Sequence, residues 1–302
     1  DVTEYQTQVT GPFGQPVLMS YYQKDEMAFF EMASLVGLGS IPAEKRNPLE
    51  LETRGIGELI LQLVDQGVKT ICVGIGGSAT NDGGIGMAAG LGVAFYDDQG
   101  HLLRPVGASL GRVARIDTSA IPKALKDIEL QVLTDVTNPL CGSQGATYIF
   151  GGQKGLNPLL FPAVDQAMQD FYQLANARIL SMAGAGAGGG MAAGLVAFAG
   201  GQISSGIEKS LDLINFDHKV QKADLVVVGE GRMDLQSLSG KAPVGVAKRT
   251  PEKIPVIAIC GSLAEDLPAF PSHHIDAAFS IVKGPCEVPD ALAHAEQNLI
   301  SC

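Results

Sequence analysis

Four short, nearly continuous apolar runs, separated by helix-length segments, constrain this chain more than any other feature. They cover residues 69–75, 128–134, 223–228 and 254–261. Apolar runs of this length between turn residues are typical of strands buried on both faces, as in parallel sheets. Because such strands alternate here with helices, the sequence predicts an α/β fold with a largely parallel sheet.

The first thirty residues follow a different pattern. Residues 3–10, 16–23 and 27–32 are separated by turn sequences and predict an antiparallel meander. Further along, Ile56, Leu59, Ile60 and Leu63 recur at helical spacing before Gly67, which predicts a helix over 55–66. The same criteria predict helices after Asp82 and over 159–180, 216–222 and 242–248, and strands over 92–96 and 278–282.

The charge balance excludes one large class of function. Lys and Arg total 21 and Asp and Glu total 32, so the formal net charge is −11. An acidic surface repels the phosphates of nucleic acids and of anionic lipids. We therefore expect no nucleic-acid partner and no membrane partner.

Glycine is unusually frequent, at 38 of 302 residues, and it clusters within apolar segments. Residues 179–207 contain no charged side chain, which is long enough for a membrane span, yet nine of them are glycine. A run so poor in bulky apolar side chains partitions weakly into lipid. We predict a buried segment packed through its glycines.

The five cysteines are an odd number and show no metal-binding spacing. Cys72 and Cys260 lie within apolar runs, where a thiol behaves as a small hydrophobe. With no apolar leader segment visible, we expect a reduced, cytoplasmic protein.

Polar, glycine-rich loops follow the apolar runs, where parallel strands present their ligand-binding ends. Backbone N–H groups of such loops bind anions, carboxylates hold Mg²⁺, and basic side chains offset phosphate charge. These are the parts of a phosphoryl-transfer site. The candidate residues are Gly76, Gly77, Ser78, Asn81, Asp82, Asp135, Asn138, Lys154, Glu230, Arg232, Asp234 and Lys241.

Several of these residues also have simpler structural explanations. Asp135 with Asn138 suits an Asx turn, and Ser78 and Asn81 suit helix caps. Glu230 and Asp234 flank Arg232 and suit a self-contained ion-pair cluster.

The first loop also fits a dinucleotide fingerprint, through Gly74, Gly76 and Ala79, with Asp97 following a second strand. Against this, Asp82 falls in the first turn of the supposed phosphate-binding helix, where it repels a pyrophosphate. Nicotinamide binding is therefore the weaker hypothesis.

Longer motifs carry a resemblance to a known family. They are GIGGSATNDGG at 74–84, DVTNPLCG at 135–142, FGGQKG at 150–155, AGAGAGGGMAAG at 183–194 and GEGRMDLQSLSGKAPVGVA at 229–247, together with EKRNPLE at 44–50. In this order they resemble the bacterial glycerate kinases of the first family, which phosphorylate D-glycerate with ATP. The resemblance covers essentially the whole chain.

The resemblance implies a Rossmann-like parallel-sheet domain with a second α/β domain inserted into it. On that pattern residues 1–203 form the inserted domain, and residues 204–302 form the C-terminal part of the Rossmann-like domain. Members of the family begin with a further strand–loop–helix region, whose two characteristic loops do not occur here. We therefore expect this chain to lack its N-terminal segment.

The resemblance also implies the chemistry. ATP and Mg²⁺ are the expected cofactors, and D-glycerate would be phosphorylated to 2-phosphoglycerate in an interdomain cleft. Asp135 or Asp234 would accept the hydroxyl proton, Arg232 and Lys241 would offset phosphate charge, and Glu230 with Asp234 would hold Mg²⁺. Substrate or phosphate contacts are expected at Gly76, Gly77, Ser78, Asn81, Asp82, Asn138 and Lys154.

Alternatives remain open at this point. They are an NAD(P)-dependent hydroxy-acid dehydrogenase, a kinase that forms 3-phosphoglycerate, and a non-catalytic protein that binds a small acid. A homodimer is also among the expectations.

Overall fold

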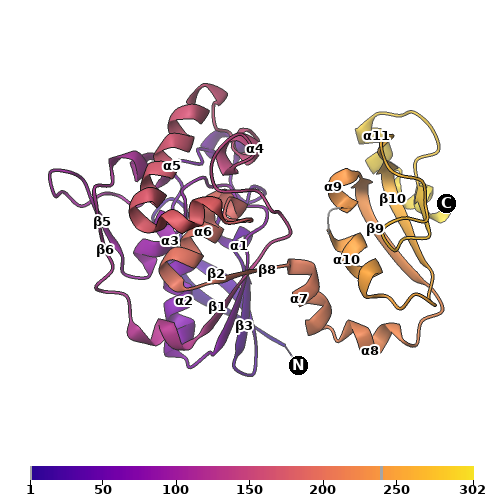
Figure 1. The fold of residues 1–302 in the computed structure, drawn as a ribbon, viewed down its shortest axis with the longest axis horizontal. Coiled ribbons are helices and arrows are strands. Elements are labelled where there is room, and N and C mark those ends of the chain that lie inside the picture. The colour runs from indigo at the N-terminus through magenta and orange to yellow at the C-terminus, as the bar shows by residue number, and fades with distance from the viewer. Residues whose placement is uncertain (1, 239–240) are drawn as a thin grey trace. The chain divides into compact units, whose positions relative to one another are not determined.

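The structure, a computed structural model, describes residues 2–238 and 241–302. The chain divides into two units, the first ending at Ser204 and the second beginning at Ser205 (Figure 1). Each unit has its own hydrophobic core and is described separately.

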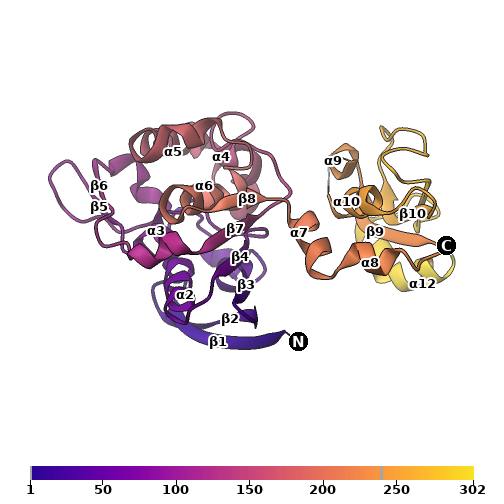
Figure 2. The ribbon, with the colours of Figure 1, turned by 60° about the horizontal axis from the view of Figure 1, so that its bottom comes forward.

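A six-stranded sheet organises the first unit, in the order β1-β2-β3-β4-β7-β8. Figure 2 shows this succession, from β1 at the bottom of the unit up to β8. The first three strands pair antiparallel, which confirms the predicted meander, and the strands from β3 to β8 pair parallel. The strands are β1 (Thr3–Thr10), β2 (Pro16–Lys24), β3 (Met27–Glu31), β4 (Thr70–Gly74), β7 (Glu129–Leu133) and β8 (Gln202–Ser204).

The register aligns the carboxyl ends of the four parallel strands. Glu31 pairs with Gly74, Gly74 with Leu133, and Leu133 with Ser204. The polar loops that follow these strands therefore begin at one edge of the sheet, where parallel sheets bind their ligands.

Helices pack against this sheet through their apolar faces. In α2 (Arg54–Asp65), Ile56, Leu59, Ile60 and Leu63 are all fully buried, as their spacing predicts. The unit also contains α1 (Ala33–Val36), α3 (Ile85–Gly90), α4 (Ala146–Phe150), α5 (Phe161–Asn176) and α6 (Ala187–Ala199), with a small antiparallel pair formed by β5 (Ala94–Tyr96) and β6 (Arg115–Asp117).

The glycine-rich segment is buried and helical. Helix α6 begins at Ala187, and the next three residues, Gly188 to Gly190, break its regular geometry with left-handed φ values of +66°, +71° and +88°. Their backbone lies against the loop that follows β4: Gly83 N–H donates to the Gly189 carbonyl at 3.0 Å. In the part of the chain that the structure describes, no helix is both long and apolar enough to cross a membrane.

The second unit is built on a parallel sheet with the order β11-β10-β9. Its core lies between strands and helices and includes Val228, Val244 and Ala258. The elements are α7 (Gly206–Leu213), α8 (Phe216–Val220), β9 (Val226–Met233), α9 (Leu235–Leu238), α10 (Ala242–Arg249), β10 (Val256–Leu263), β11 (Ala277–Ser280), α11 (Val288–Ala293) and α12 (Ala295–Ile300).

The α/β class with a parallel sheet is confirmed, but one strand boundary is wrong. The apolar run ends at Val228, whereas β9 continues to Met233, because Arg232 and Met233 still pair with Ser262 and Leu263 of β10. Glu230 and Arg232 therefore lie on a strand and not in the loop that the sequence predicted.

The glycine contact makes a stability prediction. A Cβ at Gly189 would lie 2.1 Å from the Thr80 carbonyl oxygen, at a φ of +71°. We expect Gly189→Ala to lose about 1–2 kcal/mol of unfolding free energy from the left-handed backbone and a further ~1–3 kcal/mol from overpacking.

Gly200→Ala is the matched control, because Gly200 ends the same helix at a φ of +68° with no heavy atom within 4 Å of the added Cβ. It should lose only the backbone contribution of about 1–2 kcal/mol. Urea denaturation measures both variants, and equal losses would show that the close contact does not matter.

Candidate active site

The loop after β4 is held by backbone hydrogen bonds to residues 36–38. Leu38 N–H donates to the Gly77 carbonyl at 2.9 Å, and Ala79 N–H donates to the Val36 carbonyl at 2.8 Å. Gly77 has a φ of +66°, which glycine adopts without strain. In the described part of the chain, the N–H groups of Gly76, Gly77 and Ser78 donate no hydrogen bond, so they are available to a ligand.

A buried lysine lies against this loop. The Nζ atom of Lys154 donates to Ser78 Oγ at 2.8 Å and to the Thr80 carbonyl at 2.7 Å. The side chain is only 3% exposed, and burial lowers the pKa of its ammonium group from 10.5 to about 7, while the negative charge of Asp82 opposes that shift. An ammonium group has three donors. Two are used here, which leaves one for a ligand.

Asp82 lies beneath the loop, where it organises the backbone. It is fully buried and accepts hydrogen bonds from Thr53 Oγ1 at 2.6 Å and from Gly84 N–H at 3.0 Å. Burial raises the pKa of its carboxyl group, and these hydrogen bonds oppose the shift. Because the carboxylate occupies the donors at the start of α3, that helix offers no site to a pyrophosphate, and the dinucleotide hypothesis loses its structural basis.

Asn81 is also fully buried and donates to Thr147 Oγ1 at 3.0 Å. Its Oδ1 atom and the Thr80 Oγ1 atom have no hydrogen-bond partner within the described residues. Neither Asn81 nor Asp82 lines the pocket described next, so direct ligand contact, as predicted for both, is not what their positions favour.

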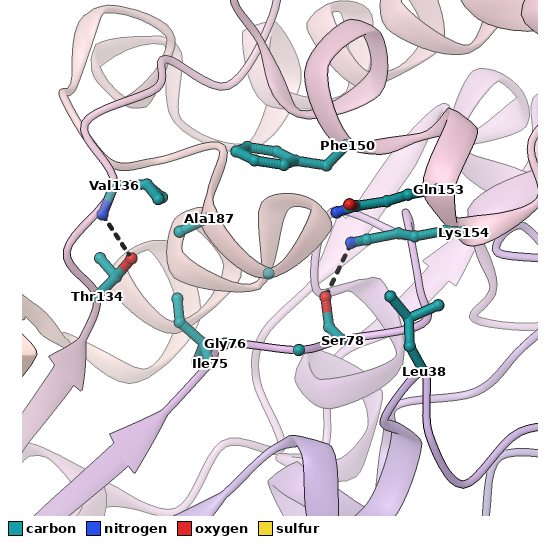
Figure 3. A pocket seen from close by; sticks show the side chains of 12 residues that line it. Leu38, Ile75, Gly76, Ser78, Thr134, Val136, Phe150, Gln153, Lys154 and Ala187 are labelled. Carbon is teal, nitrogen blue, oxygen red and sulfur yellow. Dashed lines mark hydrogen bonds between the residues drawn. The ribbon is translucent and has the colours of Figure 1, made fainter. Parts of the chain in front are cut away.

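A pocket of about 150 Å³ opens at the carboxyl ends of β4 and β7. Figure 3 shows Ser78 below it, with Gln153 and Lys154 pointing into it from one side, and Phe150 lying across it. The polar lining consists of Ser78, Thr134, Gln153, Lys154 and the backbone of Gly76, Gly77 and Gly188; the apolar lining consists of Leu38, Ile75, Val136, Phe150 and Ala187.

Two further predicted residues lie outside this lining. Asp135 is exposed and stands between Thr134 and Val136, which both line the pocket. Asn138 uses its Nδ2 atom to donate to the Gln144 carbonyl at 2.8 Å, so it shapes the loop after β7.

The second unit brings its own candidate residues together. Asp234 caps the short helix α9: its Oδ1 atom accepts from Ser237 N–H at 3.0 Å, and its own N–H donates to Ser237 Oγ at 3.2 Å. The Lys241 Nζ atom lies 3.9 Å from the same Oδ1 atom. This cap is a structural role that the sequence did not predict for Asp234.

Glu230 and Arg232 are two positions apart on β9 and therefore share one face of the sheet. The Glu230 Oε1 atom is buried with no hydrogen-bond partner in the described residues. Within the same residues Arg232 forms no ion pair, so the self-contained cluster with Glu230 and Asp234 is not formed. Beside Glu230, an apolar pocket of about 430 Å³ extends to Leu292 and Leu299.

The carboxylates of the second unit can be compared with what a bound metal ion requires. No group of three or more His, Cys, Asp or Glu side chains among the described residues is arranged to hold one. Mg²⁺ usually takes one or two carboxylates together with substrate phosphates. The orphaned Oε1 atom of Glu230 fits that smaller demand.

The sequence pattern missed Gln153, although it lies directly before Lys154 in the FGGQKG motif. It also missed Thr53, which supports Asp82 from the start of α2. A single hydroxyl or amide side chain carries no periodicity, so only its position in the fold identifies it.

The buried amine makes a pH prediction. Between about pH 7 and 10.5 the unfolded chain binds a proton at Lys154 that the folded chain does not. The free energy of unfolding should therefore rise with pH across this window, by up to ~1.4 kcal/mol per pH unit, relative to Lys154→Met.

Urea denaturation at several pH values measures this difference. The control is Lys123→Met at an exposed position, which should keep the slope of the unsubstituted protein. Parallel curves for the protein and Lys154→Met would contradict the assignment of the shifted group.

Comparison with known proteins assigns the whole chain to a family. Residues 1–302 match the glycerate kinase family. A glycerate kinase of Neisseria meningitidis serogroup B is 57% identical over 99% of this chain and 81% of its own length. The glycerate 2-kinase of Escherichia coli K12 is 41% identical over 96% of this chain and 78% of its own length.

A solved structure from Salmonella typhimurium LT2, described as a glycerate kinase 2, matches with a TM-score of 0.79 and 40% identity, over 99% of this chain and 80% of that one. These relatives span the two units and the motifs at both sites. The chain therefore belongs to the glycerate kinase family.

Proposed function

We propose that this protein transfers a phosphoryl group from ATP to the 2-hydroxyl of D-glycerate. The proposal rests on one observation: in a chain of the glycerate kinase family, a buried ammonium group and unengaged loop amides face a pocket of about 150 Å³. A pocket of this size suits a three-carbon acid. The name of the Escherichia coli relative, glycerate 2-kinase, favours the 2-phospho product over the 3-phospho product.

The acid binds in the first unit. Its carboxylate accepts from the Lys154 ammonium and from the N–H groups of Gly76, Gly77 and Ser78, since charge-assisted bonds of this kind are the strongest available. Leu38, Val136 and Phe150 cover its carbon atoms. Asp82 acts indirectly, because it holds the backbone of the loop.

The second unit supplies the nucleotide site. Glu230 and Asp234 hold Mg²⁺, which neutralises phosphate charge when it is bound. Arg232 and Lys241 offset the charge that develops on the transferred phosphoryl group, because this reaction depends on positioning and electrostatics. The apolar pocket of about 430 Å³ beside Glu230 has room for the nucleoside.

Asp135 and Asp234 are the candidates for accepting the hydroxyl proton. Asp135 directly follows Thr134, which lines the pocket proposed for the acid (the acid pocket). This position favours Asp135 over Asp234 as the proton acceptor. Asn138 keeps the loop of Asp135 in place through its bond to Gln144.

A cytoplasmic location accords with this role, since ATP is an intracellular substrate. A homodimer stays a prediction, which light scattering of the purified protein tests.

A coupled assay of ADP release, on the full-length protein with D-glycerate and MgATP, tests the function. We expect turnover with D-glycerate, and phosphorus NMR should identify 2-phosphoglycerate as the product. If there is no turnover above background, the kinase proposal is wrong. If stabilisation occurs with NAD(P)H and not with MgATP, the dehydrogenase alternative gains support.

The carboxylate of Asp234 is tested by Asp234→Asn. Asparagine caps a helix as well as aspartate does, so α9 and the melting temperature should be preserved. Because the charge is lost, the Mg²⁺ concentration for half-maximal activity should rise by roughly tenfold, which corresponds to about 1.4 kcal/mol of binding free energy.

The control is Asp266→Asn, an acidic residue of the same unit outside both described sites, which should leave the Mg²⁺ requirement unchanged. If Asp234→Asn lowers the melting temperature and leaves the Mg²⁺ requirement unchanged, Asp234 is a cap and not a metal ligand.

A further inference from the structure

Gln153 projects a primary amide into the acid pocket, next to the buried lysine. It belongs to a short 3₁₀ helix of one turn, Gly152–Lys154, and lines the pocket. Figure 3 shows its amide pointing the same way as the Nζ atom of Lys154. The two side chains therefore face the same ligand.

The other polar side chains of the pocket each take part in a hydrogen bond within the protein. Ser78 Oγ accepts from Lys154, and Thr134 Oγ1 accepts from Val136 N–H at 3.3 Å. The side chain of Gln153 forms no hydrogen bond within the residues that the structure describes, and it is exposed at the pocket. It thus offers both an amide donor and an amide acceptor to whatever binds there.

This chemistry matches a hydroxyl group. A carboxylate only accepts hydrogen bonds, and the Lys154 ammonium with the loop amides satisfies it. A hydroxyl both donates and accepts, and a carboxamide is complementary to it in both respects. Apart from Ser78, Thr134, Lys154 and the glycine backbone, the pocket walls are apolar. Without Gln153, a second hydroxyl would therefore have fewer groups to replace the hydrogen bonds that it makes with water.

We propose that Gln153 is the specificity-determining residue that recognises the primary hydroxyl of glycerate, the one that is not phosphorylated. The substrate class is then the 2,3-dihydroxy acids, and simple 2-hydroxy acids are discriminated against at this position. The inference rests on the proposed function of the same pocket.

The turn that carries Gln153 is held by its backbone and does not need the amide. Leu156 N–H donates to the Gly151 carbonyl at 3.1 Å, and Gly155 N–H donates to the Gly152 carbonyl at 3.0 Å. Gly155 has a φ of +92° and ends the turn. Replacement of Gln153 by a side chain of similar length should therefore leave the fold and Lys154 in place.

The experiment compares two ligands in two proteins. Gln153→Met keeps the length of the side chain and removes both hydrogen-bonding groups. D-Lactate has the 2-hydroxyl and carboxylate of D-glycerate and lacks the primary hydroxyl. We expect the variant to lose about 10- to 100-fold in kcat/KM for D-glycerate, while the inhibition constant of D-lactate changes less than about twofold.

Gln99→Met is the matched control, because Gln99 lies in an exposed turn outside the pocket lining. It should leave kcat/KM for D-glycerate and the inhibition constant of D-lactate unchanged. Thermal unfolding checks that Gln153→Met is folded. If D-glycerate and D-lactate are affected equally, or if neither is affected, Gln153 does not recognise the primary hydroxyl. If the unsubstituted protein does not phosphorylate D-glycerate at all, the proposed function itself fails, which is a separate result.

Discussion

Close backbone contact between two glycine-rich segments shapes the pocket at the carboxyl ends of β4 and β7, where we propose that the acid binds. The segments 76–84 and 183–194 approach so closely that a Cβ on Gly84 would lie 2.9 Å from the Gly194 Cα atom. The Gly83–Gly189 hydrogen bond joins them. Because no side chain separates the two segments at these glycines, the backbone of Gly188 contributes to the pocket lining together with Ser78. The high glycine content thus has a geometric purpose in this part of the fold.

The buried lysine is the second constraint, and it is costly. Removing an ammonium group from water is unfavourable unless its donors are satisfied and an opposite charge lies nearby. Ser78 and Thr80 satisfy two donors of Lys154, and Asp82 supplies the opposite charge from below the loop. The lowered pKa records the part of the cost that these partners do not offset. An anion at the third donor would reduce that cost, so ligand binding and lysine protonation favour one another.

The sequence predicted the elements that carry strong periodicity. The meander, α2 and the central strands follow from alternation, from helical spacing and from apolar runs. It missed β6 and β8, which have three residues each and include polar or charged side chains, whereas the equally short β5 was predicted from the apolar residues around it. It ended β9 too early, because Glu230 and Arg232 are polar and yet still pair with β10. Pairing with a distant strand is a tertiary effect that no local pattern records.

For the candidate site, the sequence pointed to loops that contribute to the pocket lining, but it did not predict how deeply each side chain is buried. Ser78 and Lys154 line the pocket as predicted positions, while Asp82 and Asn81 lie beneath it. Ser78 lines the pocket, whereas Asn81, three positions further along the loop, is fully buried outside the lining. The depth of burial thus separates side chains that can contact a ligand from those that support the loop. Aspartate is a common ligand and also a common loop anchor, so its identity alone does not separate the two roles.

The placement of carboxylates has a physical reason within this scheme. The lining of the acid pocket contains a lysine, a glutamine, two hydroxyl side chains and no acidic side chain. A carboxylate at the centre of that pocket would repel the carboxylate of the substrate, in a setting where water screens poorly. A proton acceptor is therefore better placed outside the lining, as Asp135 is next to Thr134. Asp82 is a poorer candidate for the acceptor for a different reason: it is fully buried outside the pocket lining, and its carboxylate already accepts hydrogen bonds from Thr53 and from the backbone at the start of α3.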